Sequence, residues 1–121
     1  MSRIVFLLFA LAVVLTSTMA FAGDGELVLG QWSDGFWYPG RVAQVKDGDT
    51  LVAFYDGDAL VLAADKVKKF DWKVGDALSC DWKRGGKYYD GKLTEMIGEF
   101  IHVDYNDGDK EDMGIGRCRT K

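Results

Sequence analysis

Aromatic and acidic residues recur together at two places in the sequence, and residues of these types can hold a cation. The first set is Trp32, Tyr38, Phe54 and Asp58, and the second is Trp82, Tyr89, Tyr105 and Asp109. The face of an aromatic ring attracts a cation, and a nearby carboxylate adds a Coulombic attraction. If the loops that carry them converge, Trp32, Tyr38 and Asp58 can bind a cationic side chain. Alternatively, these bulky residues cap a small core and fill the contact between two repeats.

The residue types that most often serve catalysis lack a suitable arrangement. His102 is the only histidine, and it falls in a segment with the alternation of a strand. No serine or cysteine stands with it and an acidic residue at a spacing typical of a nucleophilic site. We therefore expect no enzymatic activity, and we interpret His102 as an outward-facing or interface residue.

Acidic triplets raise the question of a calcium site. Asp-Gly-Asp occurs at residues 47–49, 56–58 and 107–109, and residues 104–112 are rich in carboxylates. Their spacing does not match a calcium-binding loop. Asp-Gly pairs between strands are first of all hairpin turns. We expect no metal and no cofactor.

The sequence contains a duplication with a period of about fifty residues. The segment GQWSDGFWYPGRV aligns with CDWKRGGKYYDGKL, and TLVAFYDGDALVL aligns with IHVDYNDGDKEDM. The second copy has one inserted residue between its tryptophan and its tyrosine. The aligned pairs include Trp32 with Trp82, Tyr38 with Tyr89, Gly40 with Gly91, Phe54 with Tyr105, and Val67 with Cys118. The repeat predicts one domain at residues 23–70 and another at 71–121.

Each copy has the pattern of five short strands, which are alternating runs rich in Val, Phe and Tyr between turn residues. In the first copy we expect strands at 27–32, 37–45, 50–55 and 59–62, and a last short strand or turn at 65–70. Asp-Gly pairs mark its turns, and Gly85-Gly86, Gly98 and Asp107-Gly108 mark those of the second copy. No convincing helical periodicity follows residue 22. The pattern predicts an all-β chain of two small, strongly bent barrels.

The two cysteines are expected on inward-facing positions. Cys80 shares one face of its strand with Trp82, and Cys118 aligns with the apolar Val67. The first and last strands of a five-stranded barrel are often neighbours, so these cysteines can form a disulfide there. Two buried free thiols are the alternative. Together with His102, the cysteines lack the spacing of metal ligands.

Residues 1–22 have the pattern of a secretory signal peptide. A short basic start is followed by an apolar run at 4–15 and by Ala20-Phe21-Ala22, an A-x-A cleavage site. A retained N-terminal anchor is the alternative, although the apolar run is short for a bilayer span. We expect cleavage after Ala22, a secreted or periplasmic protein, and membrane contact only during export. An oxidising compartment favours the disulfide.

The charge balance argues against nucleic acid as a partner. The chain has 15 Lys and Arg against 19 Asp and Glu, which makes a formal net charge of −4. Phosphate contacts dominate the affinity of nucleic-acid binders, so a net-negative chain is a poor general binder. A protein or peptide is the expected partner.

These motifs resemble the Tudor-like group, which includes the agenet and Tudor-knot variants. In the first copy the resemblance is carried by Val28, Trp32, Asp34, Gly35, Tyr38, Pro39, Val42, Val52, Phe54, Asp56, Gly57 and Asp58. In the second copy it is looser, and it is carried by Trp82, Gly85, Tyr88 or Tyr89, Val103, Tyr105, Asp107, Gly108 and Asp109. It implies SH3-like five-stranded barrels and a non-enzymatic binding role. It also implies that the two aromatic–acidic sets are cages for methylated lysine or arginine, the first copy being the better candidate.

The sequence therefore predicts an exported module that recognises a protein partner, through a cationic or methylated side chain, in aromatic-lined pockets. Two other interpretations stay open. The chain could be a structural or assembly component of the cell envelope that associates through strand edges and exposed aromatics. It could also bind cell-wall glycans, because aromatic rings stack on sugars; this last interpretation is an analogy with other SH3-like barrels.

Overall fold

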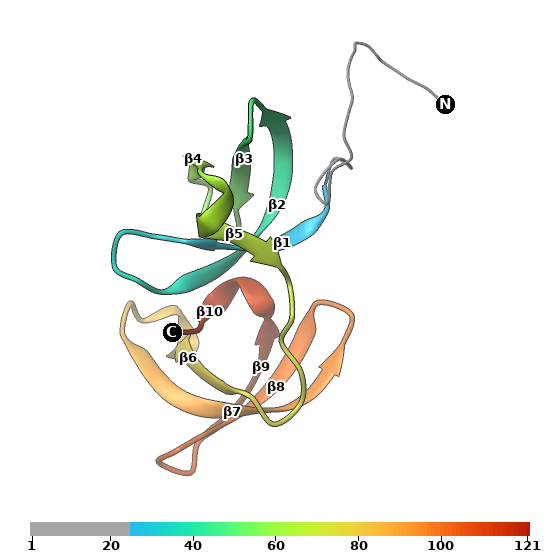
Figure 1. Cartoon of the computed structure of the whole chain (residues 1–121). Coiled ribbons are helices and arrows are strands. Elements are labelled where there is room, and N and C mark those ends of the chain that lie inside the picture. The colour runs from blue at the N-terminus through green and yellow to red at the C-terminus, as the bar shows by residue number, and fades with distance from the viewer. Residues whose placement is uncertain (1–24) are drawn as a thin grey trace.

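The computed structural model describes residues 25–121, which form two five-stranded antiparallel sheets, one from each copy (Figure 1). The predicted signal peptide and its cleavage site lie outside the described residues. Within residues 25–121 no helix has the length and apolar character needed to cross a membrane. The predicted all-β fold of two tandem barrels is confirmed.

The first copy contains five strands and one short 3-10 helix. These are β1 (Leu27–Gln31), β2 (Trp37–Lys46), β3 (Asp49–Phe54), β4 (Ala59–Leu62), η2 (Ala64–Lys66) and β5 (Val67–Lys69). The strand order in the sheet is β4-β3-β2-β1-β5, so the first and last strands are neighbours.

The second copy repeats this plan and adds a 3-10 turn after its first strand. Its elements are β6 (Ala77–Asp81), η3 (Trp82–Arg84), β7 (Tyr88–Ile97), β8 (Phe100–Tyr105), β9 (Lys110–Gly114), η4 (Ile115–Arg117) and β10 (Cys118–Arg119). The order is β10-β6-β7-β8-β9.

The two sheets share their register as well as their order. Gly40 lies opposite Phe54 in the first sheet, and Gly91 lies opposite Tyr105 in the second. Both long strands carry a bulge at the same place, two residues further on. A Cβ atom at Gly40 would lie 2.6 Å from a methyl group of Val52, so only glycine allows this close crossing of strands.

The barrels are packed against each other through strand β1. Val28 points into the core of the first copy, whereas Leu29 belongs to the core of the second, and both are 0% exposed. Trp37 packs against the second core from the same side. Burying both faces of one strand removes the polar alternation that a half-exposed strand would show.

Backbone contacts also join the copies. Trp37 N–H donates to the carbonyl of Thr120 at 2.7 Å, and Thr120 N–H donates back at 3.0 Å. At Gly116 the backbone rests on the Tyr55 ring so closely that a Cβ would lie 2.5 Å from the Tyr55 Cβ. The two copies thus form one packed unit with a fixed relative orientation.

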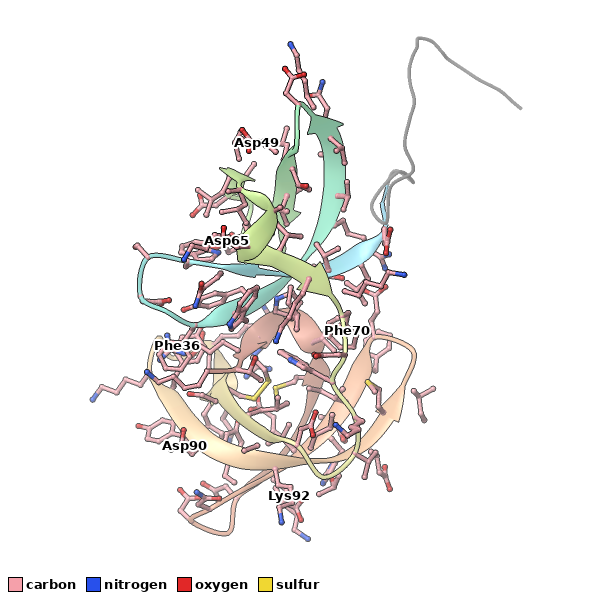
Figure 2. All side chains as sticks on the ribbon, viewed as in Figure 1. Phe36, Asp49, Asp65, Phe70, Asp90 and Lys92 are labelled. Atoms are coloured by element: carbon pink, nitrogen blue, oxygen red, sulfur yellow. A yellow bond between two sulfur atoms is a disulfide. The ribbon has the colours of Figure 1, made fainter. Side chains whose placement is uncertain are left out.

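A disulfide links Cys80 and Cys118 across β6 and β10 (Figure 2). The equivalent pair in the first copy is Gly30 opposite Val67. Closing a loop with a sequence separation of 38 residues stabilises the fold by about 4 kcal/mol through the unfolded chain.

Candidate functional site

The second aromatic–acidic set surrounds one pocket. Trp82, Tyr89, Tyr105, Asp107 and Asp109 line a cavity of about 120 Å³ at the end of the second barrel. All four members that the sequence analysis named for this copy lie in it. Asp107, which opens the same Asp-Gly-Asp turn, was not assigned to that set but also lines the cavity.

Two of the aromatic rings form the walls of the pocket, and the third forms its base. Trp82 and Tyr89 stand at 88° to each other, with ring centroids 6.4 Å apart. Tyr89 is 44% exposed and forms the outer wall, whereas Tyr105 is 5% exposed and lies at the base. Lys83 Nζ lies 4.9 Å from the Trp82 ring centroid, and Lys83 does not line the pocket.

A tight turn holds the two carboxylates at the rim. Asp109 N–H donates to Asp107 Oδ1 at 2.9 Å, and Tyr105 N–H donates to the carbonyl of Asp109 at 2.7 Å. Gly108 adopts φ 98°, a conformation that favours glycine. Both carboxylates are exposed and therefore remain available to a cation at the pocket mouth.

Glu111 supports the pocket from beneath. Its carboxylate accepts a hydrogen bond from the Tyr105 hydroxyl at 2.8 Å and from the Lys83 backbone N–H at 3.1 Å. It also pairs with Arg117 at 2.6 Å, and the two charged side chains are only 13% and 16% exposed. One carboxylate thereby fixes the floor ring, the loop after Trp82 and the 3-10 turn η4.

These contacts change the ionisation of both partners. Burial alone would raise the pKa of Glu111, but hydrogen bonds from Arg117, Tyr105 and the Lys83 N–H lower it below its ordinary value. Burial, together with the hydrogen bond to Glu111, raises the pKa of Tyr105. Near neutral pH the floor therefore consists of a neutral phenol held by an ionised carboxylate.

The aromatic residues predicted for the cage of the first copy lie close together. The Trp32 ring centroid is 5.0 Å from that of Tyr38 and 5.3 Å from that of Phe54. Asp58 is exposed in the β3–β4 turn. The cavity beside Trp32 is lined by neither Tyr38, Phe54 nor Asp58. The three aromatic residues of the first copy are thus packed against one another and do not line one cavity together.

Three sequence differences account for the contrast. The inserted residue in the second copy widens the loop after Trp82, where Lys83 and Arg84 adopt φ 50° and φ 60°. The position of Glu111 is occupied by Leu60 in the first copy, as the strand pairing shows. Phe54 also lacks the hydroxyl group that Tyr105 donates to that carboxylate.

Tyr38 serves the contact between the copies instead. The Arg119 guanidinium lies 3.9 Å from the ring centroids of Phe36 and of Tyr88, which come from different copies. Arg119 donates to the Tyr38 hydroxyl at 2.9 Å, and that hydroxyl donates to Asp34 at 2.7 Å. Burial, with the bond to Asp34, raises the pKa of Tyr38 to about 12. Arg119 of the chain itself thus packs on the rings of Phe36 and Tyr88.

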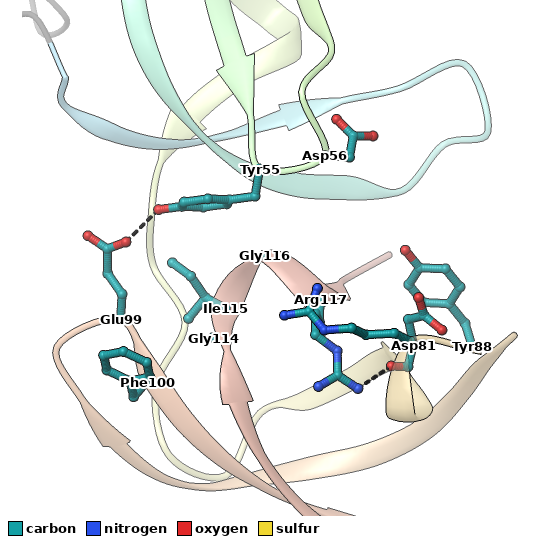
Figure 3. A pocket seen from close by; sticks show the side chains of 11 residues that line it. Tyr55, Asp56, Asp81, Tyr88, Glu99, Phe100, Gly114, Ile115, Gly116 and Arg117 are labelled. Carbon is teal, nitrogen blue, oxygen red and sulfur yellow. Dashed lines mark hydrogen bonds between the residues drawn. The ribbon is translucent and has the colours of Figure 1, made fainter. Parts of the chain in front are cut away.

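A larger groove of about 450 Å³ lies between the copies (Figure 3). Its polar walls are largely engaged: Glu99 accepts from Tyr55 at 2.5 Å and pairs with Arg41. Arg117 donates to the carbonyl of Asp81 at 2.5 Å as well as to Glu111. None of the predicted cage residues lines this groove.

His102 lies on β8, away from the aromatic pocket. Its ring nitrogens face Asp112 at 2.6 Å and Asp104 at 3.1 Å, and the hydrogen bond to Asp112 raises the pKa of His102. Among residues 25–121, no three His, Cys, Asp or Glu side chains are grouped in a way that could hold a metal ion.

Comparison with solved structures identifies the fold as a tandem Tudor-like one. The Crb2 tandem Tudor domains have a TM-score of 0.56 and 16% identity, over 88% of this chain and 83% of that chain. The tandem agenet domain 3-4 of ADCP1 has a TM-score of 0.38 and 16% identity, over 84% of this chain and 81% of that chain. AGD34 of Arabidopsis thaliana AGDP1 has a TM-score of 0.38 and 15% identity, over 84% of this chain and 83% of that chain. No protein-family model and no curated protein matches the sequence.

Glu111 was missed by the sequence analysis, although a signal for it exists. It occupies the alternating position that holds Leu60 in the first copy, so the repeat alignment places a carboxylate on an apolar position. A buried carboxylate requires hydrogen-bond partners, which makes such a substitution informative.

Replacing Glu111 by glutamine should destabilise the protein in a pH-dependent way. We expect the free energy of unfolding to fall by about 2 kcal/mol at neutral pH, because Arg117 loses its buried counter-charge. The folded pKa of Glu111 lies below its ordinary value of 4.5. The difference between wild type and Glu111→Gln should therefore be full above that pH and shrink as the pH falls through the folded pKa.

Urea unfolding at a series of pH values measures this difference. Glu95→Gln, at an exposed position on β7, is the matched control and should change stability little. A Glu111→Gln effect that is absent at neutral pH, or that grows in acid, would contradict the role given to the carboxylate.

Proposed function

We propose that the chain is an exported, non-enzymatic protein-binding module that holds a cationic side chain of its partner in the second-copy pocket. The observation that carries this proposal is the set of three aromatic rings and two carboxylates around one small cavity. The tandem Tudor-like fold supports a binding role, and the chemistry of the pocket supports the ligand class.

The lining suits a cation with apolar substituents. Each favourable ring contact with a cation contributes about 0.5–2 kcal/mol, depending on desolvation. No lysine or arginine lines this pocket, although Lys83 Nζ lies 4.9 Å from the Trp82 ring centroid. Three of the five lining residues are aromatic, and a methylated ammonium, which is less strongly hydrated than a bare ammonium, loses less hydration free energy when it enters such a site.

The size of the pocket limits what can enter. A cavity of about 150 Å³ accommodates benzene, so a cavity of about 120 Å³ suits one side-chain head group. The perpendicular rings of Trp82 and Tyr89 form a corner, whereas stacking on a sugar requires an open platform. These features favour a methylated lysine or arginine side chain over a glycan.

Export forms part of the proposal and is motivated by the leader pattern at residues 1–22. The Cys80–Cys118 bond supports it, because disulfides persist in oxidising compartments. Mass spectrometry of protein recovered from cells of the producing organism should find a chain that begins at Gly23. An intact Met1 on protein retained in the cytoplasm would contradict export.

Binding can be tested with short peptides that contain trimethyllysine, dimethylarginine, lysine or alanine at one central position. Calorimetric or NMR titration should give the tightest binding for a methylated peptide and none for alanine. Trp82→Ala and Tyr89→Ala should each weaken binding about tenfold or more, because each removes one wall.

Trp32→Ala is the matched control, because Trp32 is the repeat equivalent of Trp82 and does not border that pocket. Circular dichroism establishes that each variant is folded. If Trp82→Ala and Tyr89→Ala bind as well as wild type while folded, or if Trp32→Ala alone abolishes binding, the second-copy pocket is not the site.

A further inference from the structure

The hairpin between β7 and β8 exposes two large apolar side chains. Ile97 is 79% exposed and Phe100 is 73% exposed, and they face each other as the last pair of the ladder. Gly98 and Glu99 form the turn between them. Figure 3 shows Phe100 beside Glu99, at the end of this hairpin.

These side chains border a groove of about 280 Å³. Its apolar floor comes from Ile101 and Met113, which are 3% and 5% exposed. The groove shares no lining residue with the aromatic pocket. It is therefore a second site, and it lies outside the proposed cation-binding function.

The first copy supplies an internal control for this surface. Lys46 pairs with Asp49 at the position where Ile97 pairs with Phe100. A similar groove is present in the first copy, and there it is bordered by these two charged residues. The same hairpin thus folds with charged residues at its tip, so the apolar pair is not a requirement of the fold.

Apolar side chains that the fold does not need, gathered around a concave surface, are typical of an interaction site. Covering Ile97 and Phe100 would remove most of their apolar area from water and would stabilise a complex. In the first copy, Lys46 and Asp49 would keep the equivalent surface hydrated.

The charges around the groove indicate what covers it. Glu95, Asp112 and His102 are the charged or titratable residues that line it, and no lysine or arginine does so. His102 is held between Asp112 and Asp104. A partner that brings a positive charge is favoured, whereas a second copy of this chain would place Glu95 and Asp112 against another acidic rim.

We propose that this groove is a docking surface for a segment of a partner protein with a large apolar side chain next to lysine or arginine. The apolar side chain lies between Ile97 and Phe100 over the Met113 floor. The neighbouring cation pairs with Glu95 or Asp112 at the rim.

The test uses the acetylated and amidated pentapeptide Gly-Lys-Leu-Lys-Gly as the probe. Methyl NMR spectra of the oxidised wild-type protein should show saturable shifts at Ile97, Ile101 and Met113. Two control peptides each lack one feature: Gly-Glu-Leu-Glu-Gly lacks the positive charge, and Gly-Lys-Gly-Lys-Gly lacks the apolar side chain. Each should bind at least about tenfold more weakly than the probe.

The double variant Ile97→Lys, Phe100→Asp places the residues of the first copy on the hairpin, so the fold should be retained. It should weaken binding of the probe about tenfold or more. Lys46→Ala, Asp49→Ala is the control in the first copy and should leave the titration unchanged.

Sedimentation of the wild type and of the double variant decides between the two occupants. A monomeric wild type with probe binding that the hairpin variant loses supports the proposal. Three outcomes would overturn it: no saturable shift at the hairpin methyls, equal binding of the acidic peptide, or a wild-type dimer that the hairpin variant dissociates.

Discussion

The aromatic pocket of the second copy depends on one largely buried carboxylate, that of Glu111. Glu111 holds the Tyr105 hydroxyl, the Lys83 N–H and the Arg117 guanidinium at once, with distances of 2.8, 3.1 and 2.6 Å. A largely buried charge is stable only when its partners are in place. The carboxylate therefore links the loop after Trp82, the Tyr105 ring and the η4 turn.

The two copies show how a duplicated fold can divide its tasks. Aromatic residues of the first copy pack together or serve the contact between copies, where Phe36 and Tyr88 hold Arg119 from both sides. Leu29 extends the core of the second copy into the first. The second copy keeps an open pocket and an apolar hairpin.

The architecture could be predicted from the sequence because its determinants are local. Alternating residues identified the strands, Asp-Gly pairs identified the turns, and the repeat alignment matched the observed register at Gly40 and Gly91. Which copy opens a pocket could not be predicted in this way. That outcome depends on ring separations of 5.0 against 6.4 Å, which follow from one inserted residue and from Glu111. The family pattern does not distinguish these features.

Nuclear Overhauser measurements on the protein with a trimethyllysine peptide would show whether a cation enters the second copy between three rings, because they report which protons lie close to the methyl groups. We expect contacts from the N-methyl protons to the rings of Trp82, Tyr89 and Tyr105. Contacts to Trp32, Tyr38 or Phe54 instead, or to no aromatic ring at saturation, would contradict it.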